Sequence, residues 1–258
     1  MGSDVLLCEV NEGVARIVLN RPDALNAISG DLVDRLGETL DSLAEDAKVR
    51  VVLLRGEGSS FCAGADLKFI LSVLDDAPAL NRYIRKVKDN ISKLERFPLP
   101  VVAATQGYAL AGGLEILLAC DLVIAAEDAV LGDQHINFGL IPGGGASQRL
   151  PRRVGQRKAK EMMLMGSRVS GTEAEALGLV NKAVPAANLL DTAEEWAATL
   201  RGKSPNGLRA MKELLNASAN VSLDAGLDLE ESVFLSYTRL NDLREGLLAF
   251  KEKRKPVY

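Results

Sequence analysis

The sequence has few of the residues that build metal centres and disulfide frameworks. Its 258 residues include one histidine and three cysteines. Cys8, Cys62 and Cys120 are odd in number and widely spaced, no pair has zinc-ligand spacing, and one histidine cannot help to build a metal site. We therefore expect no metal ion, and we expect three reduced thiols in a reducing compartment.

A long apolar run and a leader segment are also lacking. No run of about 18 apolar residues occurs, because the longest apolar tract, near residues 109–126, is broken by Glu115 and Asp121. The start, MGSDVLLCEV, has no basic region and meets acidic residues at Asp4 and Glu9, which is unlike a signal or transit peptide. We predict no membrane span and a cytoplasmic location.

Positive charge is not in excess either. Lysine and arginine number 31 against 35 acidic residues, the net charge is −4 and the pI is about 5.3. Nucleic-acid binding needs clustered positive charge, so we expect no nucleic-acid partner. Basic residues do cluster at 149–160 and 249–256. Each cluster is compatible with a solvated helix face or with a site for an anionic ligand.

What the sequence does contain is an alternation of strand and helix patterns. Residues 4–10 and 14–19 predict a β-hairpin. Ser29 predicts the start of an amphipathic helix. Continuous apolar residues predict buried strands at 49–56, 99–107 and 122–128. Helices are expected over 79–96 and from Gly112 onward.

From about residue 146 the pattern is helical. The expected helices are 146–166, 172–177, 188–202, 204–219 and 222–252. This order predicts an α/β fold, with a β/α core over residues 1–185. Residues 186–258 then form a C-terminal helical region that packs on the core or on a neighbouring subunit.

Two loops of small residues, CAGADL and YALAGGLEILLACD, are candidates for a binding site. Residues 63–65 let the backbone approach a ligand closely, and Asp66 can cap the helix that follows. Gly112 and Gly113 open a helix whose first N–H groups have no partner within the helix, and such a terminus attracts a negatively charged oxygen. Close packing of helix on strand explains the glycines equally well.

Glu115 and His135 are the candidate acid–base residues. Glu115 lies one turn into a helix with no polar face, where burial raises the pKa of a carboxyl toward neutrality. Alternatively, a backbone N–H or an arginine satisfies it. His135, in LGDQHINFGL, is the only histidine. It is either catalytic or a structural ring bonded to the backbone.

Five segments, taken in order, resemble the enoyl-CoA hydratase/isomerase (crotonase) superfamily. They are NRPDALNAIS, FCAGADL, QGYALAGGLEILLACDLVIAAEDAVLG, FGLIPGGGASQRLPRRVG and LREGLLAFKEKRKP. The resemblance implies a crotonase-like spiral of β-β-α repeats with a C-terminal helical trimerisation region. It also implies an acyl-CoA thioester as substrate, no separate cofactor, because coenzyme A is part of the substrate, and a homotrimer or a hexamer formed from two trimers.

The resemblance also assigns roles to individual residues. The backbone N–H groups of Ala63 and Gly112 form an oxyanion hole for the thioester oxygen, and Glu115 is the first of the two acids of a hydratase. Phe250 and Lys253 contact the coenzyme A that a neighbouring subunit binds. The other residues expected to line the substrate are Ala24, Ala63, Gly64, Ala65 and Asp66.

The second acid of a hydratase is expected 20 residues after Glu115, and His135 occupies that position. Three hypotheses follow: a hydratase in which Glu115 and His135 share the acid–base work, another reaction of the superfamily, or an acyl-CoA-binding protein without catalysis. The second includes C–C hydrolysis of a β-diketone and isomerisation. The loop PGGGAS lacks the acidic residue expected for β-diketone hydrolysis, and His135 stands where an isomerase has its base. Hydration is therefore the favoured hypothesis.

Overall fold

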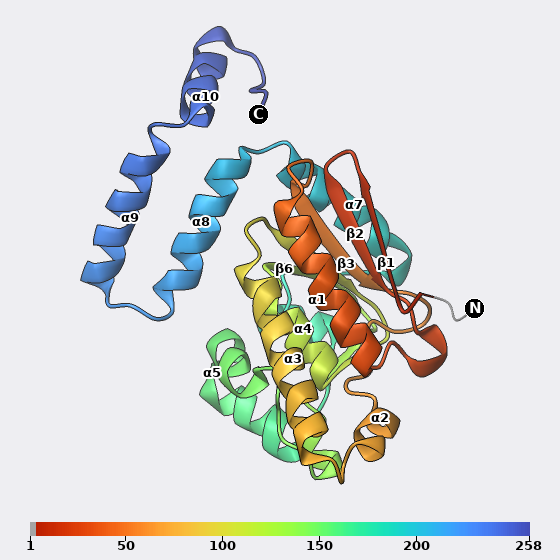
Figure 1. The fold of residues 1–258 in the computed structure, drawn as a ribbon. Coiled ribbons are helices and arrows are strands. Elements are labelled where there is room, and N and C mark those ends of the chain that lie inside the picture. Colours follow the sequence, from red (N-terminus) through yellow and green to blue (C-terminus); the bar gives the residue numbers. More distant parts are fainter. Residues whose placement is uncertain (1–3) are drawn as a thin grey trace.

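The structure is a computed structural model that describes residues 4–258. Residues 1–3 lie outside the described residues. They belong to the segment in which we predict no leader. The centre of the fold is a six-stranded sheet in the order β1-β2-β3-β4-β6-β9 (Figure 1). Only β1 is antiparallel to its neighbour. The strands are β1 (Leu6–Asn11), β2 (Val14–Leu19), β3 (Val51–Gly56), β4 (Val101–Thr105), β6 (Leu122–Ala126) and β9 (Lys182–Val184).

The predicted N-terminal hairpin and first helix are confirmed. β1 and β2 are joined by Glu12 and Gly13, which have φ values of 47° and 80°, the positive pair that a tight hairpin turn needs. Helix α1 (Gly30–Glu45) begins where the Ser29 side chain accepts a hydrogen bond from the Leu32 N–H. Its apolar face packs against α3 (Ala77–Arg96) and β1.

A second, three-stranded sheet positions the candidate site. It contains β5 (Tyr108–Leu110), β7 (Val130–Gly132) and β8 (Val169–Ser170) in that order, with β5 and β7 parallel. The sequence pattern did not predict β5, β7, β8 or β9 as separate strands. Each has only two or three residues, which is too short to show a periodic pattern.

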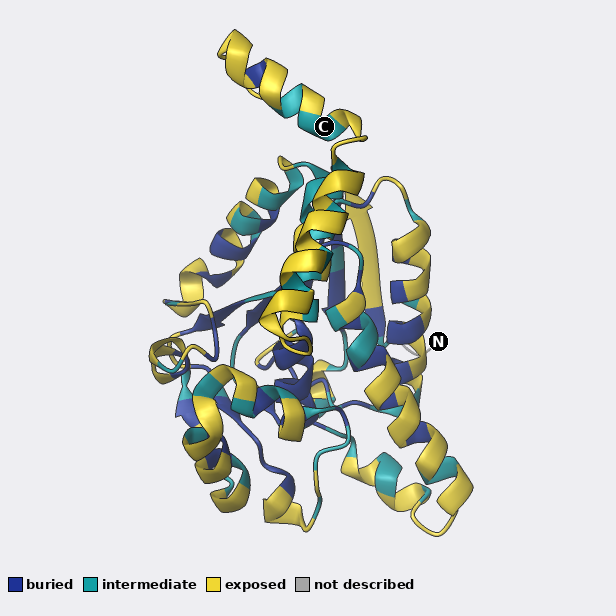
Figure 2. Ribbon diagram, turned by 90° about the vertical axis from the view of Figure 1, so that its left-hand side faces the viewer, coloured by how far each residue is buried: buried dark blue, intermediate teal, exposed yellow. Residues whose placement is uncertain are grey.

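Helices enclose the two sheets and bury most of the apolar side chains between the layers (Figure 2). All residues of α4 (Gly112–Ala119) are buried, and α7 (Leu189–Arg201) packs on β2, β3, β4 and β6. The remaining helices of this part are α2 (Leu67–Ser72), α5 (Ala146–Met165), α6 (Gly171–Ala176), η1 (Pro22–Ala24), η2 (His135–Phe138) and η3 (Ala186–Asn188). Gly155 interrupts α5 with φ 78° and ψ 160°, so the predicted helix 146–166 is kinked rather than continuous.

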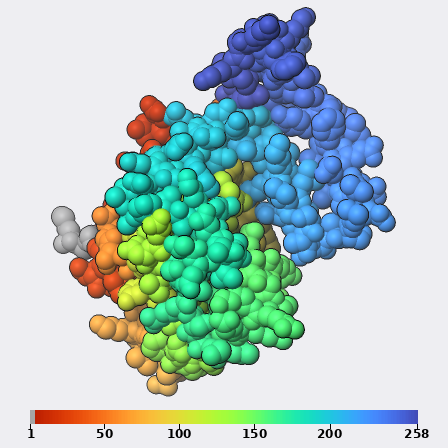
Figure 3. All heavy atoms as spheres, turned by 180° about the vertical axis from the view of Figure 1, so that it is seen from behind, coloured from red at the N-terminus to blue at the C-terminus, as the bar shows by residue number. Residues whose placement is uncertain are grey.

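The C-terminal region contains three helices, α8 (Pro205–Ser218), α9 (Leu223–Tyr237) and α10 (Asn241–Glu252). Helix α8 packs against α3, and its Lys212 pairs with Asp121 at 2.6 Å. Helices α9 and α10 project away from the two sheets (Figures 1 and 3). The prediction of one helix over 222–252 is wrong, because the chain turns at 238–240 and Leu240 is extended. The mixed α/β fold and the C-terminal helices are confirmed, while the division at residue 185 stays a prediction.

Cys8, Cys62 and Cys120 are free, and burial raises the pKa of the Cys62 thiol to about 12, so this thiol stays protonated at neutral pH. Within residues 4–258, no helix is both long enough and apolar enough to cross a bilayer.

Candidate functional site

The topology brings the two candidate acid–base residues together. β5 leads directly into α4, which carries Glu115, and β7 leads into the segment that carries His135. Because the two strands are parallel neighbours, their carboxyl ends lie at the same edge of the sheet, where the Ala111 N–H donates to Gly132 O at 2.9 Å. Residues 20 positions apart in the sequence therefore meet in one place.

Glu115 is a buried carboxylate that is satisfied on one side only. Its side chain is 2% exposed, and Oε1 accepts hydrogen bonds from the N–H groups of Gly144 at 2.8 Å and Ala146 at 3.0 Å. A Cβ on Gly144 would lie 2.6 Å from Oε2, so the glycine is needed for this close approach. Burial raises the pKa of Glu115, opposed mainly by the Ala146 N–H and the charge of His135. Both the structural and the catalytic interpretation of Glu115 are thus compatible with its contacts.

His135 lies between two carboxylates. Its Nδ1 is 3.0 Å from Asp133 Oδ1, and its Nε2 is 4.0 Å from Glu115 Oε2. The first distance is a hydrogen bond and the second is too long for one. Burial alone lowers the pKa of His135, but the hydrogen bond and the charge of Asp133, together with the charge of Glu115, raise it above its ordinary value. Both carboxylates therefore stabilise a proton on the ring.

Asp133 is a residue of this site that the sequence analysis missed. Its side chain is 1% exposed. Asp133 directly follows β7, and one residue, Gln134, separates it from His135 at the start of η2. The available signal was an acidic residue two positions before the only histidine, LGDQH.

The prediction that the Ala63 N–H forms the oxyanion hole is wrong in this structure. That N–H donates to Leu25 O at 3.0 Å, so it is already used. Ile28 N–H donates to Gly64 O and Asp66 N–H donates to Ile28 O, and the N–H of Ala65, between them, points to the opposite side. Among residues 4–258, no acceptor is recorded for the N–H groups of Ala65 and Gly112.

These two N–H groups lie close together. A Cβ on Gly112 would be 3.6 Å from Ala65 N, and Gly112 begins α4, so its N–H has no partner within the helix. The preceding Ala111 has φ 48° and ψ −113°, a backbone conformation that costs free energy and is typical of functional turns. The pair Ala65 and Gly112 therefore offers two donors to a negatively charged oxygen.

We expect Gly112→Ala to lower kcat by about 100-fold or more, as much as the loss of one donor of an oxyanion hole, because the added methyl group crowds the oxygen that the two N–H groups bind. The new methyl group would lie beside Ala65 N and 2.8 Å from Ile28 Cδ1, the end of a flexible side chain, so the fold is expected to survive. Steady-state kinetics and thermal unfolding measure the two effects. Gly202→Ala is the matched control, because its Cβ would meet no atom closer than 3.6 Å. Equal loss of activity in both variants would contradict the assignment.

The loops predicted to hold the substrate lie side by side. Ala24 ends η1 in the loop whose Leu25 O accepts the Ala63 N–H. Asp66 caps α2 by accepting from the Lys68 and Phe69 N–H groups, and it pairs with Arg21 at 2.8 Å. Burial raises the pKa of Asp66, but the bonds with Arg21 and Phe69 outweigh it and lower the pKa. The Asp66 carboxylate is thus committed to structure, and the Ala65 N–H of this loop remains for a ligand.

The structure of one chain does not bring Phe250 and Lys253 to this site. Both belong to the end of α10, which lies beyond α9 and away from α4 (Figure 1). Phe250 is 86% exposed. If these residues contact a ligand, the ligand is bound by another subunit.

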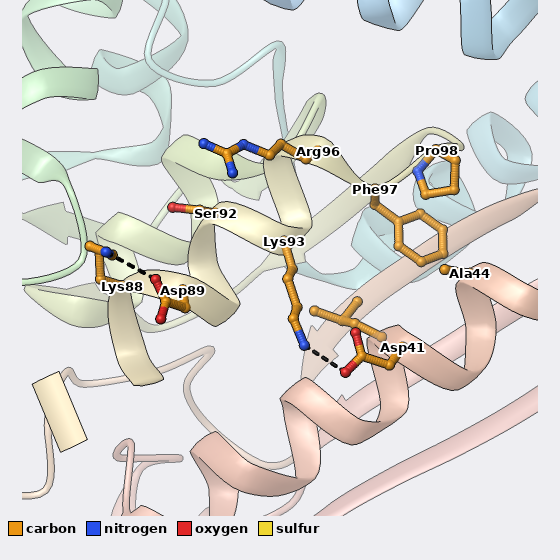
Figure 4. A pocket seen from close by; sticks show the side chains of 10 residues that line it. Asp41, Ala44, Lys88, Asp89, Ser92, Lys93, Arg96, Phe97 and Pro98 are labelled. Carbon is orange, nitrogen blue, oxygen red and sulfur yellow. Dashed lines mark hydrogen bonds and ion pairs between the residues drawn. The ribbon is translucent and has the colours of Figure 1, made fainter. Parts of the chain in front are cut away.

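A separate surface cleft lies between α1 and α3 (Figure 4). Its volume is about 410 Å³, and none of the predicted site residues lines it. Lys93 pairs with Asp41 at 2.6 Å, and Lys88 pairs with Asp89 at 3.0 Å, so most of its charges neutralise one another. Among the described residues 4–258, no three His, Cys, Asp or Glu side chains are arranged to hold a metal ion.

Comparison with known proteins gives matches over nearly the whole chain. The family profile described as enoyl-CoA hydratase/isomerase matches residues 9–258. YngF of Bacillus subtilis (strain 168), which is named for an enoyl-CoA hydratase/isomerase, is 40% identical over 100% of this chain and 99% of its own. The enoyl-CoA isomerase/hydratase fer4 of Mycosarcoma maydis is 38% identical over 95% and 92%. The crystal structure of an enoyl-CoA hydratase from Bacillus anthracis superposes with a TM-score of 0.95, at 38% identity and 98% coverage of both chains.

Proposed function

Because the chain belongs to the enoyl-CoA hydratase/isomerase family of the crotonase superfamily, whose members act on acyl-CoA thioesters, we propose that it adds water across the C2=C3 bond of a 2-enoyl-CoA. The observation that carries this proposal is the buried pair of Glu115 Oε2 and His135 Nε2, which face each other at 4.0 Å. Close to each other lie two N–H groups without an acceptor among residues 4–258, those of Ala65, in the loop before α2, and of Gly112, which opens the helix that carries Glu115. A proton-transfer pair beside two oxygen-binding donors is what hydration of a conjugated thioester requires.

The two N–H groups bind the thioester oxygen. When water attacks C3, the electrons of the double bond move onto this oxygen and an enolate forms. Preorganised N–H donors stabilise the enolate more than the neutral carbonyl, which lowers the barrier to attack. Ala65 replaces Ala63 in this role, since the Ala63 N–H is bonded to Leu25 O.

Glu115 and His135 divide the proton transfers. The ionised Glu115 accepts a proton from water while the water oxygen bonds to C3. The imidazolium of His135 then gives its Nε2 proton to C2 as the carbonyl re-forms. Glu115 next returns its proton to His135, so the pair ends with the one proton with which it began. The hydrogen bond and charge of Asp133, with the charge of Glu115, outweigh burial and raise the pKa of His135, which favours the charged ring that gives up the proton.

The proposed ligand contacts follow the loops at the mouth of the site. The backbone of Ala63, Gly64 and Ala65 lies along the acyl-CoA, and Ala24 lies toward the adenine end. Because the reaction uses only proton transfers and water, it needs no cofactor apart from the coenzyme A of its substrate.

We further propose a homotrimer, or two such trimers paired as a hexamer, in which Phe250 and Lys253 contact the coenzyme A of a neighbouring subunit. Large apolar side chains on the projecting helices support this assembly. Leu223 is 77% exposed, Leu247 62% and Phe250 86%, and exposed apolar surface of this extent is typical of an interface.

Isomerisation of a 3-enoyl-CoA to a 2-enoyl-CoA is the second candidate. A single base that moves a proton from C2 to C4 can perform it, and Nε2 of His135 has the position and the raised pKa for such a transfer. The name of the relative fer4 includes both activities.

We expect the purified protein to hydrate crotonyl-CoA or a longer 2-enoyl-CoA, seen as loss of the absorbance of the conjugated thioester. An isomerase would instead raise this absorbance when given a 3-enoyl-CoA. A panel of β-diketones tests C–C hydrolysis. Binding of acyl-CoA without turnover of any substrate in the panel would contradict the proposed hydration and support a binding protein.

A further inference from the structure

Asp133 is a buried carboxylate that makes two hydrogen bonds, both with His135. Its Oδ1 accepts hydrogen bonds from the His135 ring at 3.0 Å and from the His135 N–H at 3.3 Å. Its Oδ2 is buried and has no hydrogen-bond partner among the described residues. A buried carboxylate is costly when unpaired, and an unsatisfied buried oxygen requires an explanation. Both bonds of this carboxylate go to the same histidine.

We infer that Asp133 is a positioning residue that holds His135 with its Nδ1–H toward Asp133 and its Nε2 toward Glu115, so that Nε2 is the atom that exchanges protons with the substrate. The inference rests on the proposed function for the identity of the reaction. The orientation itself is a property of the protein without substrate.

The tautomer follows from the chemistry of the two partners. An ionised carboxylate only accepts hydrogen bonds, so the ring nitrogen at 3.0 Å from Oδ1 must carry a hydrogen. In the neutral ring the other nitrogen, Nε2, is then the bare one. The proton that the ring gains and loses is the Nε2 proton, which faces Glu115.

Asp133 also stabilises the charged form of the ring. Among residues 4–258, two carboxylates have an oxygen within 4.0 Å of a ring nitrogen: Asp133, from the β7–η2 turn, and Glu115, from α4. A neutral ring leaves two buried carboxylates without a counter-charge, whereas an imidazolium lies between them. The raised pKa of His135 agrees with this arrangement.

The turn before η2 has a second anchor that does not touch the ring. Gln134 donates to Gly166 O at 2.7 Å and accepts from Arg168 Nε at 3.0 Å and from Asn137 at 3.0 Å. Gln134 thus anchors the turn to its surroundings, while Asp133 contacts both the ring and the backbone N–H of His135. Because an asparagine at 133 can still accept from that N–H, substitutions at the two neighbours separate the loosening of the turn from the loss of charge beside the ring.

The single histidine allows a direct test by NMR. Protein prepared with isotope-labelled histidine and without a histidine tag gives one imidazole ring, whose chemical shifts report both the tautomer and the pKa. We expect the neutral ring to carry its proton on Nδ1, and we expect the pKa to lie above that of a free histidine. A neutral ring protonated on Nε2, or a pKa at or below the ordinary value, would overturn the inference without any mutation.

Asp133→Asn supplies the functional half of the test. The neutral amide no longer stabilises the imidazolium and can itself donate to Nδ1, so the histidine pKa falls and the Nδ1–H preference is lost. We expect kcat for 2-enoyl-CoA hydration to fall by about 10- to 100-fold with KM nearly unchanged, a part of the 10²- to 10⁴-fold that acid–base catalysis supplies. The alkaline limb of the pH profile moves to lower pH.

Gln134→Ala is the matched control. It loosens the same turn without changing the charge beside the ring, so it is expected to lower the melting temperature and leave the histidine pKa, the tautomer and the alkaline limb in place. A shift of the limb equal to that of Asp133→Asn would show that the effect is structural and would overturn the inference. If the NMR result is as expected but no enoyl-CoA is hydrated, the proposed function fails and the orientation of His135 stands.

Discussion

Glu115→Gln is expected to lower kcat for hydration by at least about 100-fold, the contribution of one general base, and to leave the protein as stable as before or more stable. The amide oxygen can accept both N–H groups, from Gly144 and Ala146, that Oε1 accepts in the wild type. The amide nitrogen takes the place of Oε2 and cannot accept a proton from water. This one substitution therefore separates the effect of Glu115 on catalysis from its effect on stability.

The expected stability follows from the pKa of Glu115. Burial raises it above the ordinary 4.5, which means that the folded protein disfavours the ionised carboxylate relative to the unfolded chain. This cost begins as pH rises through the unfolded pKa and is complete above the folded pKa. At pH 7 the wild type carries the cost and the glutamine variant does not.

Urea denaturation and steady-state kinetics measure the two effects, with Asp121→Asn as the matched control. Asp121 is a second, largely buried carboxylate, and its partner is Lys212 at 2.6 Å, away from the candidate site. Asp121→Asn removes the charge that Lys212 pairs with and leaves a buried lysine without a counter-charge. The free energy of unfolding therefore falls, while kcat is kept. A Glu115→Gln variant that unfolds at lower urea and retains its kcat would assign Glu115 a structural role.

His135→Gln is expected to lower kcat by about 100-fold or more and to remove the alkaline limb of the pH profile. Glutamine keeps hydrogen-bonding capacity but carries no transferable proton near neutral pH. Glutamate at the same position should retain more activity than glutamine, mainly at low pH. A carboxyl between Asp133 and Glu115 must be protonated to act as an acid, and the two neighbouring charges raise its pKa.

His135→Gln also has a predictable effect on the free energy of unfolding. The folded pKa of His135 lies above its ordinary 6.5, so the charged ring stabilises the folded state. This contribution is fully present below the unfolded pKa, near 6.5, and is lost as pH rises through the folded pKa. The wild type should therefore exceed His135→Gln in free energy of unfolding most at pH 6 and least at alkaline pH, measured by urea titrations across this range. A difference that grows with pH would contradict the raised pKa.

The sequence predicted the long elements and the family well. The apolar periodicity of α1, the hairpin at Glu12 and Gly13, and the helix opened by Gly112 all depend on local patterns, and the structure confirms them. The placement of His135 in the position of a second acid came from the resemblance to the crotonase superfamily, which implies an acid 20 residues after Glu115.

The details of the site could not be predicted because they depend on pairings between distant segments. Whether Ala63 or Ala65 has a free N–H is decided by where Leu25 O and Ile28 lie, which no local pattern records. The contact of Asp133 with the ring depends on the turn that η2 makes after a strand of three residues. The turn at 238–240 separates two helices that share one helical pattern in the sequence.

The proposed hydration by Glu115 and His135 is tested most directly by isotope incorporation. Crotonyl-CoA is incubated with the protein in water enriched in ¹⁸O and deuterium, and the product is analysed by mass spectrometry. We expect one ¹⁸O atom at C3 and one deuterium at C2, with both incorporated at least about 100-fold more slowly in Glu115→Gln and in His135→Gln. Deuterium without ¹⁸O, with the double bond displaced, would identify an isomerase and contradict hydration. Incorporation at the wild-type rate in both variants would contradict the assignment of the pair.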